Sequence, residues 1–117
     1  MMLPGRRARQ VGEQILHEMA YLLLEKVNDP RVSSVTLTGI RLSNDLKQAR
    51  VYFSVLGEEN QVALAQAGME SAKGFIKREI GVRLSLRYVP EMRFIHDTSL
   101  AAGSHMEQIL DGLKDDE

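Results

Sequence analysis

The sequence contains no cysteine and no tryptophan among its 117 residues. The missing cysteine excludes a disulfide framework, a thiolate zinc site, an iron–sulfur cluster and a cysteine nucleophile. Long apolar runs are missing as well: the longest, Met19 to Leu24, has six residues, whereas a membrane helix needs about 18 or more. The arginines near the N-terminus are not followed by the apolar segment of a secretory signal. These absences predict a soluble protein in the cytoplasm.

A strong net charge is also absent, because 15 Lys and Arg stand against 16 Asp and Glu, but the charges are segregated along the chain. Residues 1–10 contain three arginines and no acid, and residues 107–117 contain five acids and one lysine. Between residues 71 and 93, six bases accompany two acids. Local clusters govern the attraction to a polyanion more than net charge does. The composition is therefore compatible with binding of RNA or DNA, but not with indiscriminate coating of either.

The apolar pattern predicts a single α+β domain whose order is helix, strand, strand, helix, broken helix, strand. From about Arg7 to Val27 apolar residues recur at helical spacing, and the helix ends at the turn-forming segment Asn28-Asp29-Pro30. Residues 35–43 and 49–55 then alternate apolar and polar side chains, which is typical of a hairpin. The alternation slips by one residue at Gly39, where we expect a β-bulge.

Helical spacing returns between about Glu59 and Ile80, but two glycines, Gly68 and Gly74, interrupt it. Each interior glycine costs about 1 kcal/mol relative to alanine, so a pair of them indicates a break or a close approach. We expect a kink at Gly74 and the end of the helical region at Gly81.

Alternation resumes between Leu84 and Phe94 and predicts a third strand, with Pro90 inside it. Proline cannot donate a ladder hydrogen bond, so this strand should lie at an edge of the sheet, with the strand at 49–55 in its centre. A crossover through the helices makes the second and third strands parallel and their connection right-handed, with all three helices on one face of the sheet.

Candidates for catalysis and metal binding are weak. The only histidines, His17, His96 and His105, lack a metal-site spacing such as H-E-x-x-H, and no glycine-rich phosphate loop occurs. His96, Asp97 and Ser99 have the residue types of a hydrolase triad. Neighbours at a strand end do not converge easily, however, and capping of the following segment is the simpler interpretation. The sequence predicts no metal, no cofactor and no enzymatic activity.

Basic residues are the better candidates for a binding site. Lys73 and Lys77 lie four residues apart on one helix face, with Arg78 beside them, and this spacing suits a phosphate backbone. The alternative is a solvated helix face with Glu70 and Glu79 as ion-pair partners, each pair worth about 0.3–0.5 kcal/mol. The sequence leaves both interpretations open.

Two further features indicate a nucleic-acid partner. Arg6, Arg7 and Arg9 stand at a predicted helix start, where the helix macrodipole disfavours cations. A basic arm that becomes ordered on a polyanion explains them, although plain solubility is an alternative. Tyr52 beside Arg50 on the outward strand face is able to stack a base, but partial burial in the core is the commoner role of such an aromatic residue.

Several short motifs occur in order along residues 7–100. They are Asn28-Asp29-Pro30-Arg31-Val32, Ser43-Asn44-Asp45-Leu46, Ser71-Ala72-Lys73-Gly74-Phe75-Ile76, Leu86-Arg87-Tyr88-Val89-Pro90-Glu91-Met92 and Asp97-Thr98-Ser99. In these motifs and in its element order the chain resembles the bacterial ribosome-binding factor A family. The resemblance implies a type II KH-like domain, related to RNA-binding KH modules. In that family an Ala-x-Gly kink between two helices replaces the KH glycine loop, and Ala72, Lys73 and Gly74 match it.

The same resemblance implies a role without catalysis in late maturation of the small ribosomal subunit, including processing of the 5′ end of its rRNA, and in growth at low temperature. It also implies binding to the immature subunit and release by a ribosome-dependent GTPase. No G-x-x-G clamp occurs, so we expect structured RNA to be read through phosphates and shape. The expected RNA contacts are Arg6, Arg7, Arg9, Lys73, Lys77, Arg78, Arg83 and Arg87.

The predicted organisation is a basic arm at residues 1–6, a KH-like RNA-binding domain at 7–100 and an acidic, flexible tail at 101–117. We expect a monomer with no membrane partner. An alternative function is a protein-binding or dimerisation module that uses the open sheet face around Tyr52 and Leu56. A small hydrolase or metal enzyme is the third interpretation.

Overall fold

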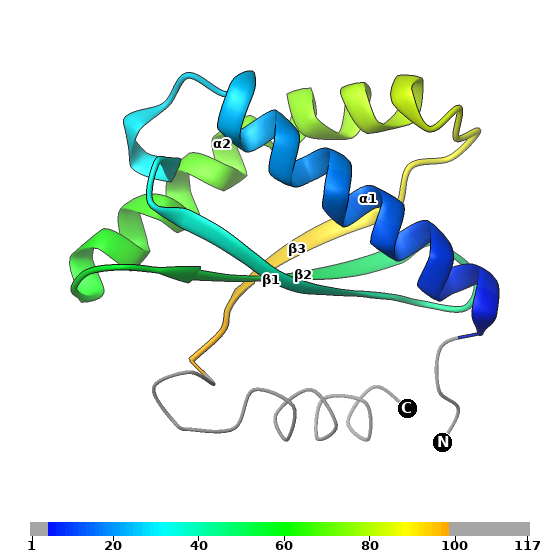
Figure 1. Cartoon of the computed structure of the whole chain (residues 1–117), viewed down its shortest axis with the longest axis horizontal. Helices are drawn as coiled ribbons and strands as arrows, with labels where there is room; N and C mark the ends of the chain where they lie inside the picture. The colour runs from blue at the N-terminus through cyan, green and yellow to red at the C-terminus, as the bar shows by residue number, and fades with distance from the viewer. Residues whose placement is uncertain (1–4, 99–117) are drawn as a thin grey trace.

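A computed structural model describes residues 5–98, in which two α-helices pack on a three-stranded sheet (Figure 1). The α+β class and the order of the elements are as expected, except that the second helical region is a single helix. The helices are α1, α2 and the short 3-10 helix η1, which span Arg6–Glu25, Glu59–Arg83 and Pro30–Val32. The strands β1, β2 and β3 span Val35–Leu42, Gln48–Val55 and Glu91–His96. The acidic tail and residues 1–4 of the basic arm lie outside the described residues.

The sheet has the order β1-β2-β3, with β1 and β2 antiparallel and β2 and β3 parallel. The hairpin, the central position of β2 and the edge position of β3 are thereby confirmed. The pairing shifts between Leu37 and Gly39, which confirms the bulge. Because of this shift Phe53 pairs with Leu37 while Tyr52 pairs with Gly39, and the apolar side chains of both strands stay on one face.

Both helices cover the same face of the sheet, so the core lies between the two layers (Figure 1). Along β2 buried residues alternate with half-buried ones. Residues 50, 52 and 54 therefore face away from the helices. Fully buried side chains come from every layer and include Ile15, Met19, Leu22, Val51, Phe53, Met69, Ile76, Ile80 and Met92.

The second helical region is one continuous helix, not two helices separated by a break. Helix α2 runs without interruption from Glu59 to Arg83, although its ribbon bends along its course in Figure 1. Gly74 lies in open space, since a Cβ built on it would meet no atom within 4 Å. The close approach occurs instead at Gly68, where a Cβ would lie 2.9 Å from Val32 Cγ1 and 3.0 Å from Arg31 Cβ. Of these two glycines, packing therefore requires Gly68, which lets η1 rest directly on the helix backbone.

The predicted end of this helix at Gly81 is wrong, by two residues. Gly81 lies inside α2, which continues to Arg83 and then closes with a left-handed residue, Ser85, at φ 53°. The Leu86 backbone N–H donates to the Gly81 carbonyl at 3.0 Å, and the Ser85 N–H donates to the Val82 carbonyl at 3.3 Å. This pattern is a Schellman motif with serine at the position where glycine is usual.

The third strand is shorter than the alternation predicted. Residues 84–90 are not in a strand, and β3 begins at Glu91, directly after Pro90. The proline ring lacks a backbone N–H, so ladder pairing begins only beyond it. The first pairing, Gln48 with Glu91, then places Met92 and Phe94 on the helix-covered face. Neither helix of residues 5–98 is long and apolar enough to cross a membrane.

Candidate nucleic-acid interface

The three arginines at the start of α1 form an exposed basic cluster. Arg6, Arg7 and Arg9 are all exposed and occupy the first turn, which contains no acid. The N-cap residue is Gly5, which provides no side-chain cap but donates its own N–H to the side-chain oxygen of Asn44 in the hairpin turn. Free N–H groups and cations thus meet at the positive end of the macrodipole, an arrangement that an anionic ligand would stabilise.

Lys73 and Lys77 lie one turn apart on one face of α2, as their spacing predicted. This face is the side of α2 next to β3. Lys73 Nζ is 2.9 Å from Glu70 Oε1 and 5.5 Å from the centre of the Phe94 ring. Lys77 Nζ is 3.2 Å from Glu91 Oε2. Both lysines are half-buried, and each has a carboxylate beside it, so this pair presents little net positive charge.

Arg83 lies on the other side of α2, toward α1. Its Nη1 is 3.4 Å from Glu18 Oε1, its Nε is 3.5 Å from Glu79 Oε1, and its guanidinium lies 5.0 Å from the centre of the Tyr21 ring. These contacts join the two helices. The structure therefore separates Arg83 from Lys73 and Lys77.

The remaining predicted contacts, Arg78 and Arg87, are exposed. Arg87 lies beyond the end of α2, with its guanidinium 5.5 Å from the centre of the exposed Tyr88 ring. Among residues 5–98 neither arginine, nor any of the three in the first turn of α1, has a carboxylate within ion-pair distance. The predicted bases thus divide into a group without such an ion pair and a group held in local ion pairs, to which the exposed Arg83 belongs.

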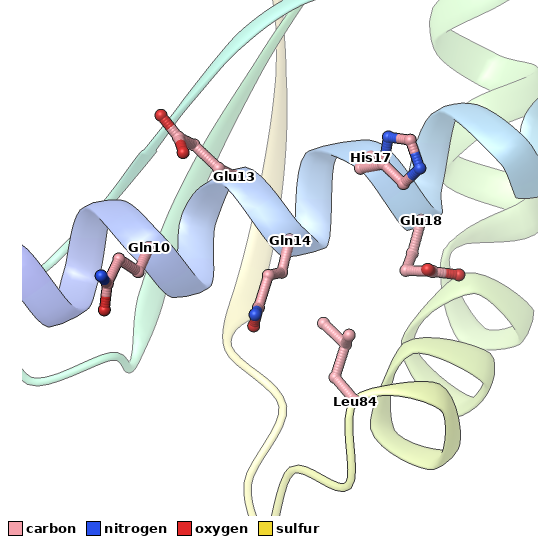
Figure 2. A pocket seen from close by; sticks show the side chains of 6 residues that line it. All are labelled: Gln10, Glu13, Gln14, His17, Glu18 and Leu84. Carbon is pink, nitrogen blue, oxygen red and sulfur yellow. The ribbon is translucent and has the colours of Figure 1, made fainter.

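A recess between α1 and the end of α2 is lined mostly by polar residues (Figure 2). Gln10, Gln14 and Leu84 line it together with Glu13, His17 and Glu18. In Figure 2 Gln14 lies on the side of α1 nearest Leu84, whereas Glu13 and His17 project from the opposite side, so these groups do not converge. Within residues 5–98 no three His, Asp or Glu side chains gather as a metal ion needs.

The Asn-Asp-Pro-Arg motif forms the turn that joins α1 to the rest of the domain. Asp29 Oδ1 accepts from the Arg31 backbone N–H at 2.9 Å, and Asp29 Oδ2 lies 2.7 Å from Arg31 Nη2. The hydrogen bonds from the Arg31 guanidinium, followed by the one from its backbone N–H, lower the pKa of Asp29. Arg31 Nη2 is also 3.5 Å from Ser71 Oγ of α2. Contacts within the fold thus account for this motif.

Asp97 of the Asp-Thr-Ser motif has a structural partner as well. It is 8% exposed, and its Oδ2 accepts from Thr38 Oγ1 at 2.8 Å. Its backbone N–H donates to the Phe53 carbonyl at 2.7 Å. The His96 ring packs near Phe53, with 5.5 Å between ring centres. These contacts fix the end of β3 against the bulge, and Ser99 lies outside the described residues.

A basic feature that the sequence interpretation did not identify lies on the open face of the sheet. Arg41 pairs with Arg50, and Arg50 pairs with Arg93. The alternation along the strands indicates the outward direction of each residue separately. Only the pairing register, which depends on the bulge and on the start of β3, shows that the three share one line.

The family model and the relatives found by sequence comparison have the same description. A family model described as ribosome-binding factor A matches residues 7–110. The chain is 46% identical over 105 residues to ribosome-binding factor A of Citrifermentans bemidjiense, which covers 90% of this chain and 88% of that protein. It is 45% identical over 107 residues to ribosome-binding factor A of Staphylococcus saprophyticus, with 92% and 94% covered.

Solved structures have the same fold. A solution NMR structure of a Thermotoga maritima protein proposed to be a ribosome-binding factor A superposes with a TM-score of 0.67 at 31% identity, covering 81% of this chain and 91% of that one. A Thermus thermophilus ribosome-binding factor A, fitted as a homology model into a cryo-EM map of a 30S complex, gives a TM-score of 0.64 at 22% identity. It covers 78% of this chain and 96% of that chain.

Proposed function

The chain belongs to the ribosome-binding factor A family, and from this premise we propose that it is a non-enzymatic assembly factor of the small ribosomal subunit. It binds the immature subunit through rRNA and supports late maturation, including processing of the rRNA 5′ end. The observation that carries this proposal is the match of the family model to residues 7–110. The exposed arginines in the first turn of α1 support it, because an uncapped helix start with three cations favours a phosphate ligand.

The proposed RNA contacts differ in how they act. The exposed arginines that have no ion pair within residues 5–98 can meet phosphates directly: Arg6, Arg7, Arg9, Arg78 and Arg87. The paired bases Lys73, Lys77 and Arg83 would have to exchange a carboxylate for a phosphate, which reduces their net contribution. Ala72, Lys73 and Gly74 would act through the shape of α2, whose bend replaces a glycine clamp.

A modest charge suits a factor that recognises one assembly state. The overall net charge of -1 gives little attraction to RNA in general. Recognition then depends on how a few cations fit a folded rRNA surface, and that fit is lost when the subunit matures. We propose that the protein acts as a monomer in the cytoplasm, without a cofactor or metal, and that a ribosome-dependent GTPase promotes its release.

Co-sedimentation tests the proposal. The full chain is incubated with immature small subunits and, separately, with mature ones, and each mixture is pelleted through sucrose. The expected result is a larger bound fraction on the immature particle. Equal or absent binding to both would contradict the assembly role. Sedimentation of the free protein at rising concentration tests the alternative, because a stable dimer without affinity for the subunit would favour a dimerisation module instead.

A further inference from the structure

The recess between α1 and the end of α2 has the size of a small-ligand site (Figure 2). Its volume of about 620 Å³ lies within the range of about 300–1,000 Å³ that is usual for such sites. Gln10 and Gln14 project from α1 on the side of Leu84, whereas Glu13 and His17 project from the opposite side of the helix (Figure 2). A ligand in the recess would therefore meet two amide groups and one aliphatic side chain.

The two amide groups of the recess are available to a ligand. Gln10 and Gln14 are both exposed, and neither side chain forms a hydrogen bond with another residue of the range 5–98. Because they are four residues apart, they lie on one face of α1, one turn from each other. An amide presents a donor and an acceptor side by side, which is the arrangement that pairs with the edge of a nucleic-acid base. This wall of the recess thus suits a flat polar heterocycle.

The charges around the recess match those of a nucleotide. At one end of the recess Glu18 Oε1 lies 3.4 Å from Arg83 Nη1, so the carboxylate there is compensated. The amide wall is neutral. At the other end, the exposed Arg6 and Arg7 precede Gln10 by one helical turn. A nucleotide has the same division, because its base is neutral and its phosphate is anionic. A base would thus fit between the helices while its phosphate stays beside the arginines.

We propose that this recess binds the base of one unpaired rRNA nucleotide, with Gln10 and Gln14 bonded to the edge of the base and Leu84 packed against its face. Arg6 and Arg7 contact the adjoining phosphates. Sequence-specific recognition of RNA generally uses unpaired bases that are turned out of the stack and bonded at their edges. The inference rests on the proposed function for the identity of the ligand as rRNA. A nucleotide that becomes base-paired as the subunit matures could no longer enter the recess, so the site would favour the immature particle.

Substitution of both glutamines in the full chain tests this site. Anisotropy measures binding of a fluorescent oligoadenylate and of the same oligomer with abasic sites in place of its bases. The wild type should bind the oligomer with bases more tightly, because an amide forms two hydrogen bonds with the edge of adenine. The double variant Gln10→Ala and Gln14→Ala should weaken that binding about fivefold or more and bind the abasic oligomer like the wild type. Gln48→Ala is the matched control, because Gln48 is exposed in β2 and does not line the recess.

Alanine is the best helix former, so the double variant should keep α1 intact, and thermal unfolding verifies this. Equal binding of the two oligomers by the wild type would overturn the proposal, and so would an equal loss of both in the double variant. Normal oligomer binding by the double variant with reduced co-sedimentation with immature subunits would overturn it by indicating a protein contact. Co-sedimentation of the wild type is measured in parallel. Its failure would contradict the assembly role, whereas normal co-sedimentation with an unaffected double variant would contradict only the base-binding site.

Discussion

At the scale of single residues, Gly68 is in contact with the turn that follows α1, whereas Gly74 faces open space. Both lie in the same helix, and neither has a positive φ. Their helical propensity is therefore the same, and only the neighbouring atoms distinguish them. Buried Val32, which has a stiff branched side chain, cannot move away from position 68 without disturbing the core.

The two glycines should respond oppositely to substitution by alanine. Gly74→Ala should raise the free energy of unfolding by about 0.5–1 kcal/mol, because alanine is the better helix former. Gly68→Ala should lower it by about 1–3 kcal/mol, because overpacking against η1 outweighs the gain in propensity. Urea unfolding of both variants measures the difference, and each variant serves as the control for the other. A stabilised Gly68→Ala would show that η1 is not packed as closely as described.

At the scale of elements, the turn around η1 is linked to α2 by side chains. An ion pair joins Asp29 and Arg31, and Arg31 contacts Ser71 of α2. The Asp29 carboxylate caps η1 and binds the Arg31 guanidinium, which in turn reaches Ser71. The backbone of the turn is held by the same carboxylate. The orientation of η1 on Gly68 therefore depends on the charge of Asp29.

This dependence predicts a pH effect on stability. The Arg31 hydrogen bonds lower the pKa of folded Asp29 below its ordinary value of 3.8. A carboxylate with a lowered folded-state pKa stabilises the protein above the unfolded pKa, and the contribution is lost as the pH falls through the folded pKa. Asp29→Asn should therefore be less stable than the wild type at pH 7, and the difference should shrink below pH 3.8. Urea unfolding measures the stability difference between the wild type and Asp29→Asn, and a difference that does not change with pH would exclude this role of the charge. The same measurement on Asp45→Asn compares Asp29 with an aspartate of the hairpin turn.

Some element boundaries could be predicted from sequence patterns and others could not. The hairpin and its bulge were predictable because alternation has a period of two and its slip is visible at Gly39. The end of α2 was not, because Ser85 rather than Gly81 adopts the left-handed conformation. Serine rarely takes that conformation, so nothing in the local sequence indicated it.

At the scale of the whole molecule, the charges are arranged on several separate surfaces. The exposed arginines of α1, the paired lysines beside β3 and the arginine row of the open face belong to different sides of the fold. A net charge of -1 hides this arrangement. Long-range attraction to RNA should therefore be weak, and contacts made at close range should determine affinity.

The salt dependence of subunit binding should show that specific contacts, and not the total charge, determine affinity. Replacing Arg6 and Arg7 by glutamine should weaken binding to immature subunits and flatten the slope of log K against log salt by about 1.4 to 1.8. The variant with Lys26→Gln and Lys47→Gln removes the same charge from exposed positions elsewhere and should keep the wild-type slope. Binding is measured by co-sedimentation at several salt concentrations. Equal flattening in both variants would mean that only total charge matters.

The sequence by itself determined the class of fold, the strand that lies in the centre and the family. Those properties depend on local patterns: side-chain periodicity, a proline that cannot pair, and short motifs in a fixed order. Only the tertiary structure decided which glycine is required by packing, which bases are held in ion pairs, and which arginines share one line. Each of these depends on distances between residues far apart in the chain, and such distances are set by packing of the helices on the sheet and by the pairing register.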